Sequence, residues 1–405
     1  MLAITGGKVL TITQGTLEGG TVLIDGGKIV AVGQNVAVPA DAEVIDARGK
    51  WVTPGLIDAH SHLAVFGEPS IPATADGNER TDPNTAQVRG RDALNPQDPA
   101  IPKVVAGGVT TVFTGPGSAN IIGGTGMVIK LRGRTVDEMI IPGTEGLKMA
   151  LGENPKRNYG EQRKMPATRM GNAAVLREAL VAAQTYLEKI DRANAEAAKD
   201  GKPAKLPDRN LKLETIGRAL KREIKARIHA HRADDILTAI SIAEEFGLDY
   251  VIEHCTYGYK IPDILAAKKV QATIGPLLMG PGKHEIWETT LENPGILARA
   301  GVKVAIQADT SSATKWLPLQ VGLAIRHGME EDEAFRAVTI NPAEIIGVAD
   351  RLGSLEAGKD ADVVVWNGHP FCNFTRAETV LIDGVKVFEL CSCDCCRSSC
   401  CCDKE

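Results

Sequence analysis

Short runs of β-branched and apolar residues, separated by turns, open and close the chain. Segment 22–32 holds two such runs on either side of an Asp-Gly-Gly sequence, which is a tight-turn signal. The peptide VLIDG occurs at 22–26 and again at 380–384. Both ends of the chain are therefore predicted to form antiparallel sheet.

The middle of the chain has a different pattern, in which a helical stretch is followed by a glycine and then by a β-branched run. Three such runs occupy 106–115, 246–254 and 300–309, and the stretch before the second of them places Ile236 and Ile240 at helical spacing. Repeats of helix, glycine and buried strand are typical of βα units around a parallel sheet. Roughly 290 residues of this pattern favour a (β/α)8 barrel over an open sheet.

Residues 158–227 interrupt the barrel pattern with two charged amphipathic stretches, which a loop of sequence KPAKLPD separates. This pattern predicts a helical insertion. A solvated excursion on the outside of the barrel is the simpler interpretation, and a lid over the site is the alternative.

Composition and charge exclude several classes of protein. Hydrophobic residues make up 43% of the chain and charged residues 24%, as is typical of a soluble globular enzyme. The formal net charge of -5 argues against a nucleic-acid partner. No apolar stretch approaches the ~20 residues of a membrane-spanning helix, and the first residues lack the basic and apolar regions of a leader peptide. We therefore expect no membrane association, and we expect the protein in the cytoplasm.

The cysteines are concentrated at one end. Seven of the nine lie within residues 391–405, and only Cys255 and Cys372 lie in the body of the chain. This distribution argues against a disulfide scaffold for the folded part. We predict that the Cys-rich tail is disordered, and a metal-loading appendage is the alternative.

The first candidate chemistry is the sequence GLIDAHSHLAVFG, which places His60 and His62 two residues apart at the end of an apolar run, with Asp58 before them. Side chains two apart along a strand point the same way. Two neutral imidazoles on one rigid strand form half of a site for zinc or a similar divalent ion.

Further polar residues end other predicted strands. His229 and His231 close one β-type run, His254 closes the next, and Asp309 ends a third. In a parallel barrel the carboxyl ends of the strands meet at one mouth, so these side chains are expected to converge with the His-x-His pair. The sequence therefore predicts a divalent metal site.

Hydrolysis is the chemistry that such a site permits. A bound divalent ion lowers the pKa of its water to about 7 and polarises a carbonyl group. Asp309 is then placed to accept the proton of the water and to return it to a departing nitrogen. A plain ligand role for Asp309 is compatible with this.

Several longer segments occur together in a specific order, and they carry a family resemblance: VTPGLIDAHSHL, AGGVTTV, RIHAHRADDILTAISIAEEFGLDYVIEH, VAIQAD and TINPAEIIGVADRLGSLEAGKDADVVVWNGHPF. On these segments the chain resembles the amidohydrolase superfamily, and most closely its imidazolonepropionase and prolidase-type branch. The resemblance implies an α/β fold in which a (β/α)8 barrel of residues 53–348 stands beside a small β-sandwich. This sandwich would combine residues 1–52 and 349–390.

The same resemblance implies a ligand set, whose members are His60, His62, His229, His254 and Asp309. His231 would then face the substrate or lie behind the ligands, although the opposite assignment of His229 and His231 stays open. Many members bridge two metals with a carboxylated lysine, which Lys148 matches; a snorkelling surface lysine is the alternative. Glu153 is a second candidate carboxylate, as a ligand or a substrate contact. One or two divalent ions, expected to be zinc, are implied.

These residues predict a hydrolase of carbon-nitrogen bonds other than peptide bonds, acting on a cyclic amide, an imidazolone-like ring or a small dipeptide-type amide. His284 follows the predicted seventh strand, and this position makes it a candidate substrate contact. An N-acetyl deacetylase and a heterocycle deaminase are rivals within the superfamily, and a metal-free scaffold is a rival from another class. The expected partner is a small-molecule substrate, and the resemblance implies a homo-oligomer.

Overall fold

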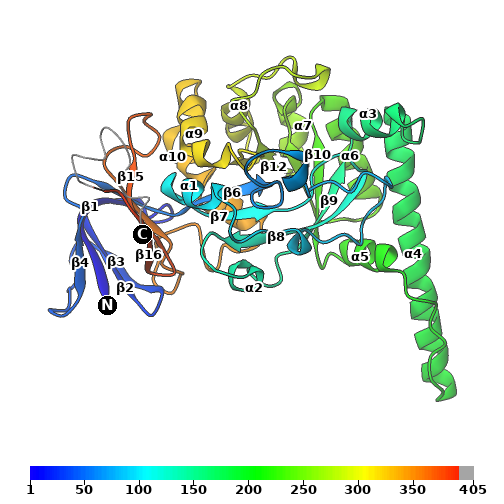
Figure 1. Cartoon of the computed structure of the whole chain (residues 1–405), viewed down its shortest axis with the longest axis horizontal. Helices are drawn as coiled ribbons and strands as arrows, with labels where there is room; N and C mark the ends of the chain where they lie inside the picture. The colour runs from blue at the N-terminus through cyan, green and yellow to red at the C-terminus, as the bar shows by residue number, and fades with distance from the viewer. Residues whose placement is uncertain (392–405) are drawn as a thin grey trace.

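Two eight-stranded sheets, one of them curved into a barrel, organise the protein (Figure 1). The computed structural model describes residues 1–391, so the predicted Cys-rich tail lies outside the described residues from position 392 onward. Both sheets are accompanied by helices in an α/β arrangement, which agrees with the predicted class.

The first sheet combines the two ends of the chain, and its strands run in the order β16-β15-β14-β5-β1-β2-β3, with β4 paired to β1. Its members are β1 (Leu2–Leu10), β2 (Thr16–Asp25), β3 (Lys28–Gly33), β4 (Glu43–Asp46), β5 (Trp51–Pro54), β14 (Val363–Trp366), β15 (Ala377–Ile382) and β16 (Val385–Glu389). The ends meet where β5 pairs antiparallel with β14, which sets Trp51 opposite Trp366. Strands from both termini thus share one hydrogen-bonded sheet, while the two-layer sandwich stays a prediction.

The second sheet forms a nearly closed barrel in which the strands follow chain order. They are β6 (Leu56–Ser61), β7 (Val109–Thr114), β8 (Ile122–Lys130), β9 (Gly146–Ala150), β10 (Lys225–Ala230), β11 (Tyr250–His254), β12 (Gln271–Ile274) and β13 (Lys303–Ile306). In the described chain, β6 and the segment after β13 are joined by a single bridge between Ser61 and Asp309. The barrel therefore has a seam between its first and last strands.

One strand departs from the predicted (β/α)8 pattern, because β8 runs antiparallel to both β7 and β9. Only residues 115–121 connect β7 to β8. A parallel partner needs a crossover of about a dozen residues or more, whereas a short connection returns the chain in the opposite direction. The prediction of a regular alternation of strand and helix is wrong at this point.

Helices pack around the barrel strands. They are α1 (Ala100–Ala106), α2 (Val136–Met139), α3 (Glu153–Glu161), α4 (Arg169–Asp200), α5 (Leu211–Leu220), α6 (Ala233–Glu245), α7 (Pro262–Ala267), α8 (Asn293–Arg299), α9 (Leu317–Arg326), α10 (Glu331–Arg336) and α11 (Ile340–Ile345). The predicted insertion at 158–227 corresponds to the end of α3 together with α4 and α5. The predicted boundary at 227 lies inside β10, which begins at Lys225.

Helix α4 has two different halves. Its start is capped by the Thr168 hydroxyl, which accepts the Gly171 N–H at 3.0 Å. Leu176 and Leu180 in the first half are fully buried, and the helix packs against α5 and α6. The remainder projects away from the body (Figure 1).

Among the described residues, no helix combines the length and the apolar character that crossing a membrane requires.

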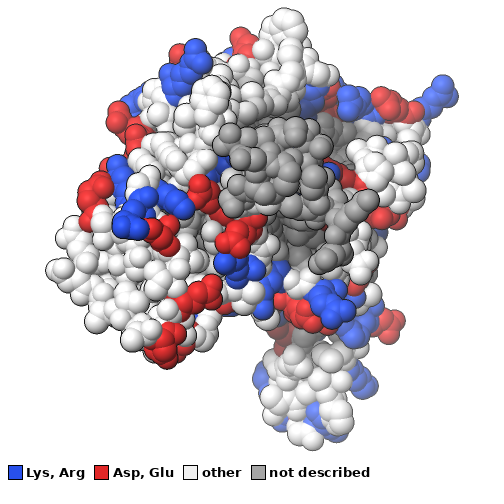
Figure 2. Space-filling model, turned by 60° about the vertical axis from the view of Figure 1, so that its left-hand side comes forward, with Lys and Arg blue, Asp and Glu red and all other residues white. Residues whose placement is uncertain are grey.

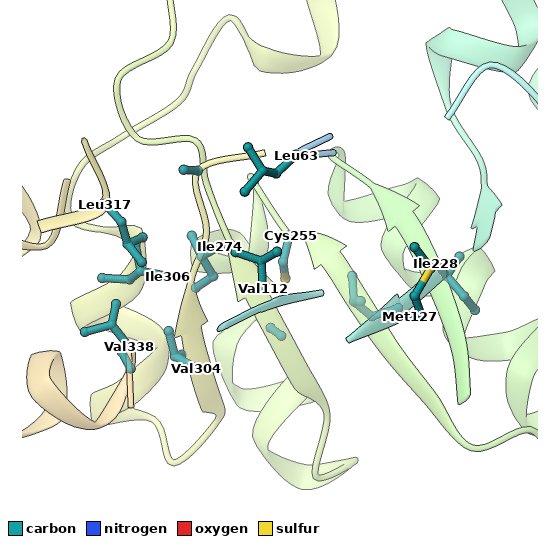
Figure 3. Packing of buried hydrophobic residues seen from close by; sticks show 14 of the residues in the cluster. Leu63, Val112, Met127, Ile228, Cys255, Ile274, Val304, Ile306, Leu317 and Val338 are labelled. Carbon is teal, nitrogen blue, oxygen red and sulfur yellow. The ribbon is translucent and has the colours of Figure 1, made fainter. Parts of the chain in front are cut away.

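An apolar core holds the barrel strands in place. Val112 of β7, Ile228 of β10 and Ile306 of β13 belong to one buried cluster, which also contains Leu317 and Val338 (Figure 3). Burial of such side chains contributes roughly 25 cal/mol per Å² of apolar surface. The surface carries charges of both signs, which lie interspersed over the face drawn in Figure 2. The core thus fixes the strand ends on which the polar residues sit.

Candidate metal centre

The histidines that the sequence places at strand ends come together at the mouth of the barrel. His60 lies near the end of β6, His229 near the end of β10, and His254 is the last residue of β11. Their ring centroids are 5.1 Å apart for His60 and His254 and 4.4 Å for His229 and His254. All three side chains are nearly inaccessible to solvent.

Among residues 1–391, two groups of side chains have ligand atoms within 4.8 Å of one another. One consists of His60, His254 and Asp309, and the other of His229, His231 and His254. His62 lies at the edge of the first group, with its Nε2 atom 3.5 Å from Asp309 Oδ1. The five ligands that the sequence analysis expects are therefore brought together, and His231 lies beside them.

The orientation of three imidazoles is fixed from behind by acceptors. His62 Nδ1 lies 2.8 Å from the carbonyl oxygen of Gly115, and His254 Nδ1 lies 2.8 Å from that of Gly275. His60 Nδ1 lies 2.8 Å from Glu253 Oε1. The carbonyl oxygens of Gly115 and Gly275 only accept, so His62 and His254 carry the proton on Nδ1 and present a lone pair at Nε2. The charge of the Glu253 carboxylate favours the same tautomer for His60.

These lone pairs point toward an anion. The Nε2 atoms of His60 and His254 lie 3.2 and 3.9 Å from Asp309 Oδ1. Burial lowers the pKa of His60, His229 and His231, and lowers that of His254 to about 3, so the rings are neutral near pH 7. Neutral lone pairs facing a carboxylate repel it unless a cation lies among them. Imidazole nitrogens with one carboxylate oxygen are a donor set that suits a divalent ion such as zinc.

The backbone at two of these residues is unusual. His254 and Asp309 have φ angles of 68° and 69°, in the left-handed region that non-glycine residues seldom adopt. Such conformations cost on the order of 1–3 kcal/mol each and concentrate at functional sites. Both side chains turn into the site from these positions.

Lys148 of β9 is buried beside the histidines rather than snorkelling to the surface, since its side chain is 4% exposed. Its Nζ atom pairs with Glu253 Oε2 and lies 3.4 Å from His60 Nε2. The bridging role of Lys148 stays a prediction.

Glu253 is a residue that the sequence analysis missed. It is fully buried, and its Oε1 atom lies 2.7 Å from Arg227 Nε and 2.8 Å from His60 Nδ1. A glutamate inside the buried run DYVIEH, next to His254, was an available signal, because a buried acid requires cationic partners. Glu253 thus links Lys148, Arg227 and His60.

Asp58, which precedes the His-x-His pair, accepts backbone N–H groups rather than an imidazole N–H. Its two carboxylate oxygens accept the backbone N–H groups of His60 at 3.0 Å and Ala308 at 3.1 Å. Burial raises the pKa of Asp58 to about 7. This residue therefore ties the first barrel strand to the segment after the last one.

His231 belongs to the second ligand group and has a polar partner at each ring nitrogen. Its Nδ1 lies 2.7 Å from Thr256 Oγ1, and its Nε2 lies 3.0 Å from the Lys283 ammonium group. A lysine ammonium only donates, so it occupies the Nε2 lone pair of His231. His229 and His231 belong to the same candidate ligand group, so the choice between them as a metal ligand stays a prediction.

Glu153 and His284 lie one residue away from side chains that reach the histidines. The neighbour of Glu153, Asn154, places its Nδ2 atom 3.4 Å from His229 Nε2, and the neighbour of His284 is Lys283. Glu153 and His284 make their contacts here through the backbone. The Glu153 N–H donates to the Glu285 carboxylate, and the His284 carbonyl oxygen accepts the Tyr257 hydroxyl. The side chains of consecutive residues in a turn or helix point in different directions. Position along the chain alone therefore could not show which residue of each pair reaches the histidines.

A cavity of about 250 Å³ opens beside the first ligand group. His62, Phe66 and Glu68 line it from the loop after β6, and Thr310 and Ser311 line it from the loop after β13. Four larger cavities in the described chain, of about 700, 610, 550 and 350 Å³, have no histidine in their walls. The smaller cavity is therefore the space that adjoins the candidate chemistry.

Comparison with known proteins identifies the family. Residues 51–387 match the model of the amidohydrolase family. The chain is 30% identical over 393 residues to amidohydrolase tasK of Hapsidospora irregularis, which covers 91% of this chain but 40% of that protein. It is 29% identical over 416 residues to an imidazolonepropionase of Geobacillus kaustophilus, covering 91% of this chain and 90% of that one.

The solved structures include a similar protein over nearly the whole chain. A crystal structure of an amidohydrolase from Thermotoga maritima superimposes with a TM-score of 0.91 at 46% identity, covering 96% of this chain and all of that one. Together with the matched residues 51–387, this places the chain in the amidohydrolase family, with imidazolonepropionases among its relatives.

Proposed function

We propose that this protein uses a bound divalent metal to hydrolyse a carbon-nitrogen bond in a small molecule. The observation that carries the proposal is the convergence of neutral Nε2 lone pairs from His60 and His254 on the Asp309 carboxylate. A metal-free scaffold has no need for this arrangement, in which the Lys148 ammonium group near His60 Nε2 offsets the repulsion between these groups only in part. We infer that a cation belongs among them.

The residues that would hold the metal are His60, His62, His229, His254 and Asp309, and the nitrogen-rich set favours zinc. Lys148, if carboxylated, would supply the bridge to a second ion. When bound, a divalent cation polarises the scissile carbonyl and makes hydroxide available near pH 7. The two-ion arrangement is supported by the position of Lys148 Nζ 3.4 Å from His60 Nε2.

The protein's own residues then manage the proton. Asp309 accepts a proton as the water oxygen bonds to the carbonyl carbon, and it delivers that proton to the nitrogen as the carbon-nitrogen bond breaks. A cyclic amide opens to an amine and an acid, and an open-chain amide gives the two as separate products. Asp309 is suited to this role because its side chain is 22% exposed and adjoins the 250 Å³ cavity through Thr310.

The substrate class is drawn from the relatives. Those named imidazolonepropionase favour an imidazolone-like ring or another cyclic amide. A small dipeptide-type amide is the next candidate on the sequence resemblance. The assay is a panel of imidazolones, hydantoins, X-Pro dipeptides and N-acyl amino acids, with and without a chelator.

The decisive variant is Asp309→Asn. We expect one or two divalent ions per purified wild-type chain by elemental analysis, and chelator-sensitive turnover of at least one substrate class. Asp309→Asn should lose turnover at least a hundredfold while it retains metal through the histidines. No metal after supplementation would refute the proposal, and full activity of Asp309→Asn would refute the proton-transfer role.

A further inference from the structure

Lys283 brings a positive charge to the mouth of the barrel from the loop that follows β12. Its side chain is 15% exposed. The Nζ atom lies 3.0 Å from His231 Nε2, 3.0 Å from Asn154 Oδ1 and 2.7 Å from Glu285 Oε1. These three partners come from the end of β10, the first turn of α3 and the loop itself.

The partners of Lys283 differ in how firmly they are held. Glu285 is fully buried, and its other oxygen accepts the Glu153 N–H at 2.7 Å, so it is a fixed anchor. Asn154 and His231 are neutral acceptors, and His231 Nε2 is a single lone pair. A negatively charged oxygen forms a stronger hydrogen bond with an ammonium group than either neutral acceptor does. Lys283 therefore has two N–H groups that an anionic ligand could take over.

Lys148 is the other lysine whose ammonium group contacts these imidazoles in the described chain, but it is not available in the same way. It lies inside the barrel and pairs with Glu253. Arg169, which approaches Glu285 at 3.8 Å, is held by both carboxylate oxygens of Asp235. Lys283 is thus the cation that adjoins the histidines from the solvent side with neutral partners on two of its N–H groups.

We propose that Lys283 binds an anionic oxygen group of the substrate and so determines specificity for amides that carry a carboxylate or a phosphonate near the scissile bond. His231 separates Lys283 from the centre, since its ring centroid lies 4.6 Å from that of His254. The anionic group is therefore a few covalent bonds from the reacting carbonyl. Asn154, the other neutral partner of Lys283, also places its Nδ2 atom 3.4 Å from His229 Nε2. This inference rests on the proposed hydrolase function.

The test compares matched substrates on matched variants. Three N-acyl substrates share one acyl group and end in a carboxylate, a phosphonate or a neutral carboxamide. For wild type we expect kcat/KM to favour one or both anionic substrates over the carboxamide. In Lys283→Met this ratio should fall about tenfold to a hundredfold, mainly through KM, as one charged hydrogen bond is lost. Lys283→Arg should retain part of the preference, and the preferred anion distinguishes carboxylate from phosphonate.

Lys260→Met is the matched control, because Lys260 pairs with Glu288 of the loop that carries Lys283 and, in the described part of the chain, contacts none of these histidines. It should leave the ratio of kcat/KM values unchanged. Equal losses on all three substrates in Lys283→Met, or an unchanged ratio, would overturn the proposal.

A binding measurement separates this inference from the proposed function. Calorimetry with metal-loaded wild type and Lys283→Met, using the N-acyl aminophosphonate and the carboxamide as probes, needs no turnover. Weaker phosphonate binding to Lys283→Met, with carboxamide binding equal in both proteins, supports the anion site even if no substrate in the panel is hydrolysed. Equal phosphonate binding to both proteins, alongside hydrolysis of N-acyl amino acids by both at the same rate, would overturn the inference and leave the hydrolase function standing.

Discussion

Replacing Glu253 by glutamine should destabilise the protein and weaken its affinity for metal at the same time. The change keeps the shape of the side chain and removes one negative charge. Arg227 Nε at 2.7 Å and the Lys148 ammonium group then lose their counter-ion, although both side chains are at most 4% exposed. Removing one partner of a buried ion pair costs about 3–5 kcal/mol.

That cost is large compared with the total free energy of unfolding of a typical domain, about 5–15 kcal/mol. The second effect acts through His60, whose Nδ1 atom lies 2.8 Å from Glu253 Oε1. Loss of a carboxylate that holds a ligating imidazole lowers metal affinity about tenfold to a hundredfold. Both effects are expected in the single variant Glu253→Gln.

Urea denaturation of the metal-free proteins measures the first effect, and calorimetric titration with zinc measures the second. Glu288→Gln, which removes a half-exposed carboxylate paired with Lys260, is the control and should change neither. The double variant Glu253→Gln with Lys148→Met should regain part of the stability, because it removes one of the two uncompensated cations. A loss below about 1 kcal/mol, together with unchanged zinc affinity, would refute the reasoning.

Three further predictions concern stability and assembly. Although burial opposes it, hydrogen bonds from Lys130 and Lys28 lower the pKa of Asp360 from 3.8 to about 2, so its stabilisation is present above about pH 4 and is lost as the pH falls toward 2. The difference in urea midpoint between wild type and Asp360→Asn should therefore shrink between pH 7 and pH 3, and a constant difference would contradict this. Gly108→Ala should lower the thermal midpoint, because φ is +81° and an added Cβ would lie 2.2 Å from the Trp366 ring; an unchanged midpoint would contradict the packing. Light scattering should give a mass of two or more times 43.0 kDa, as expected for a homo-oligomer. A mass equal to that of one chain would contradict the predicted homo-oligomer.

The strand-end histidines could be located from the sequence because their signal is local. Each of His60, His229 and His254 ends a β-type run, and a barrel brings such ends together. The reversal of β8 could not be found in this way, because apolar periodicity reports that a strand exists and not its direction. The short connection at 115–121 was the one available cue.

Partners that depend on packing across the barrel were also beyond the sequence. Glu253 contacts Lys148, which lies 105 positions earlier in the chain, and His60, which lies 193 positions earlier. No local sequence pattern encodes such contacts. Lys283 and Asn154 were missed by one position each, because the direction of a side chain within a turn depends on the backbone. Sequence reasoning thus identified the elements that carry the site, and the structure identified which neighbours face it.

The seam of the barrel has a consequence for how the protein would respond to a bound divalent metal. The first and last barrel strands meet through the Ser61–Asp309 bridge and the Asp309 N–H, which donates to the His60 carbonyl at 3.2 Å. His60 and Asp309 are also members of one candidate ligand group. A cation held by both residues would link the first barrel strand to the segment after the last one, where a single β-bridge joins them. Amide hydrogen exchange at 58–62 and 305–309 should therefore slow on metal loading more than exchange in β10 and β11, which are joined by a continuous ladder on both sides.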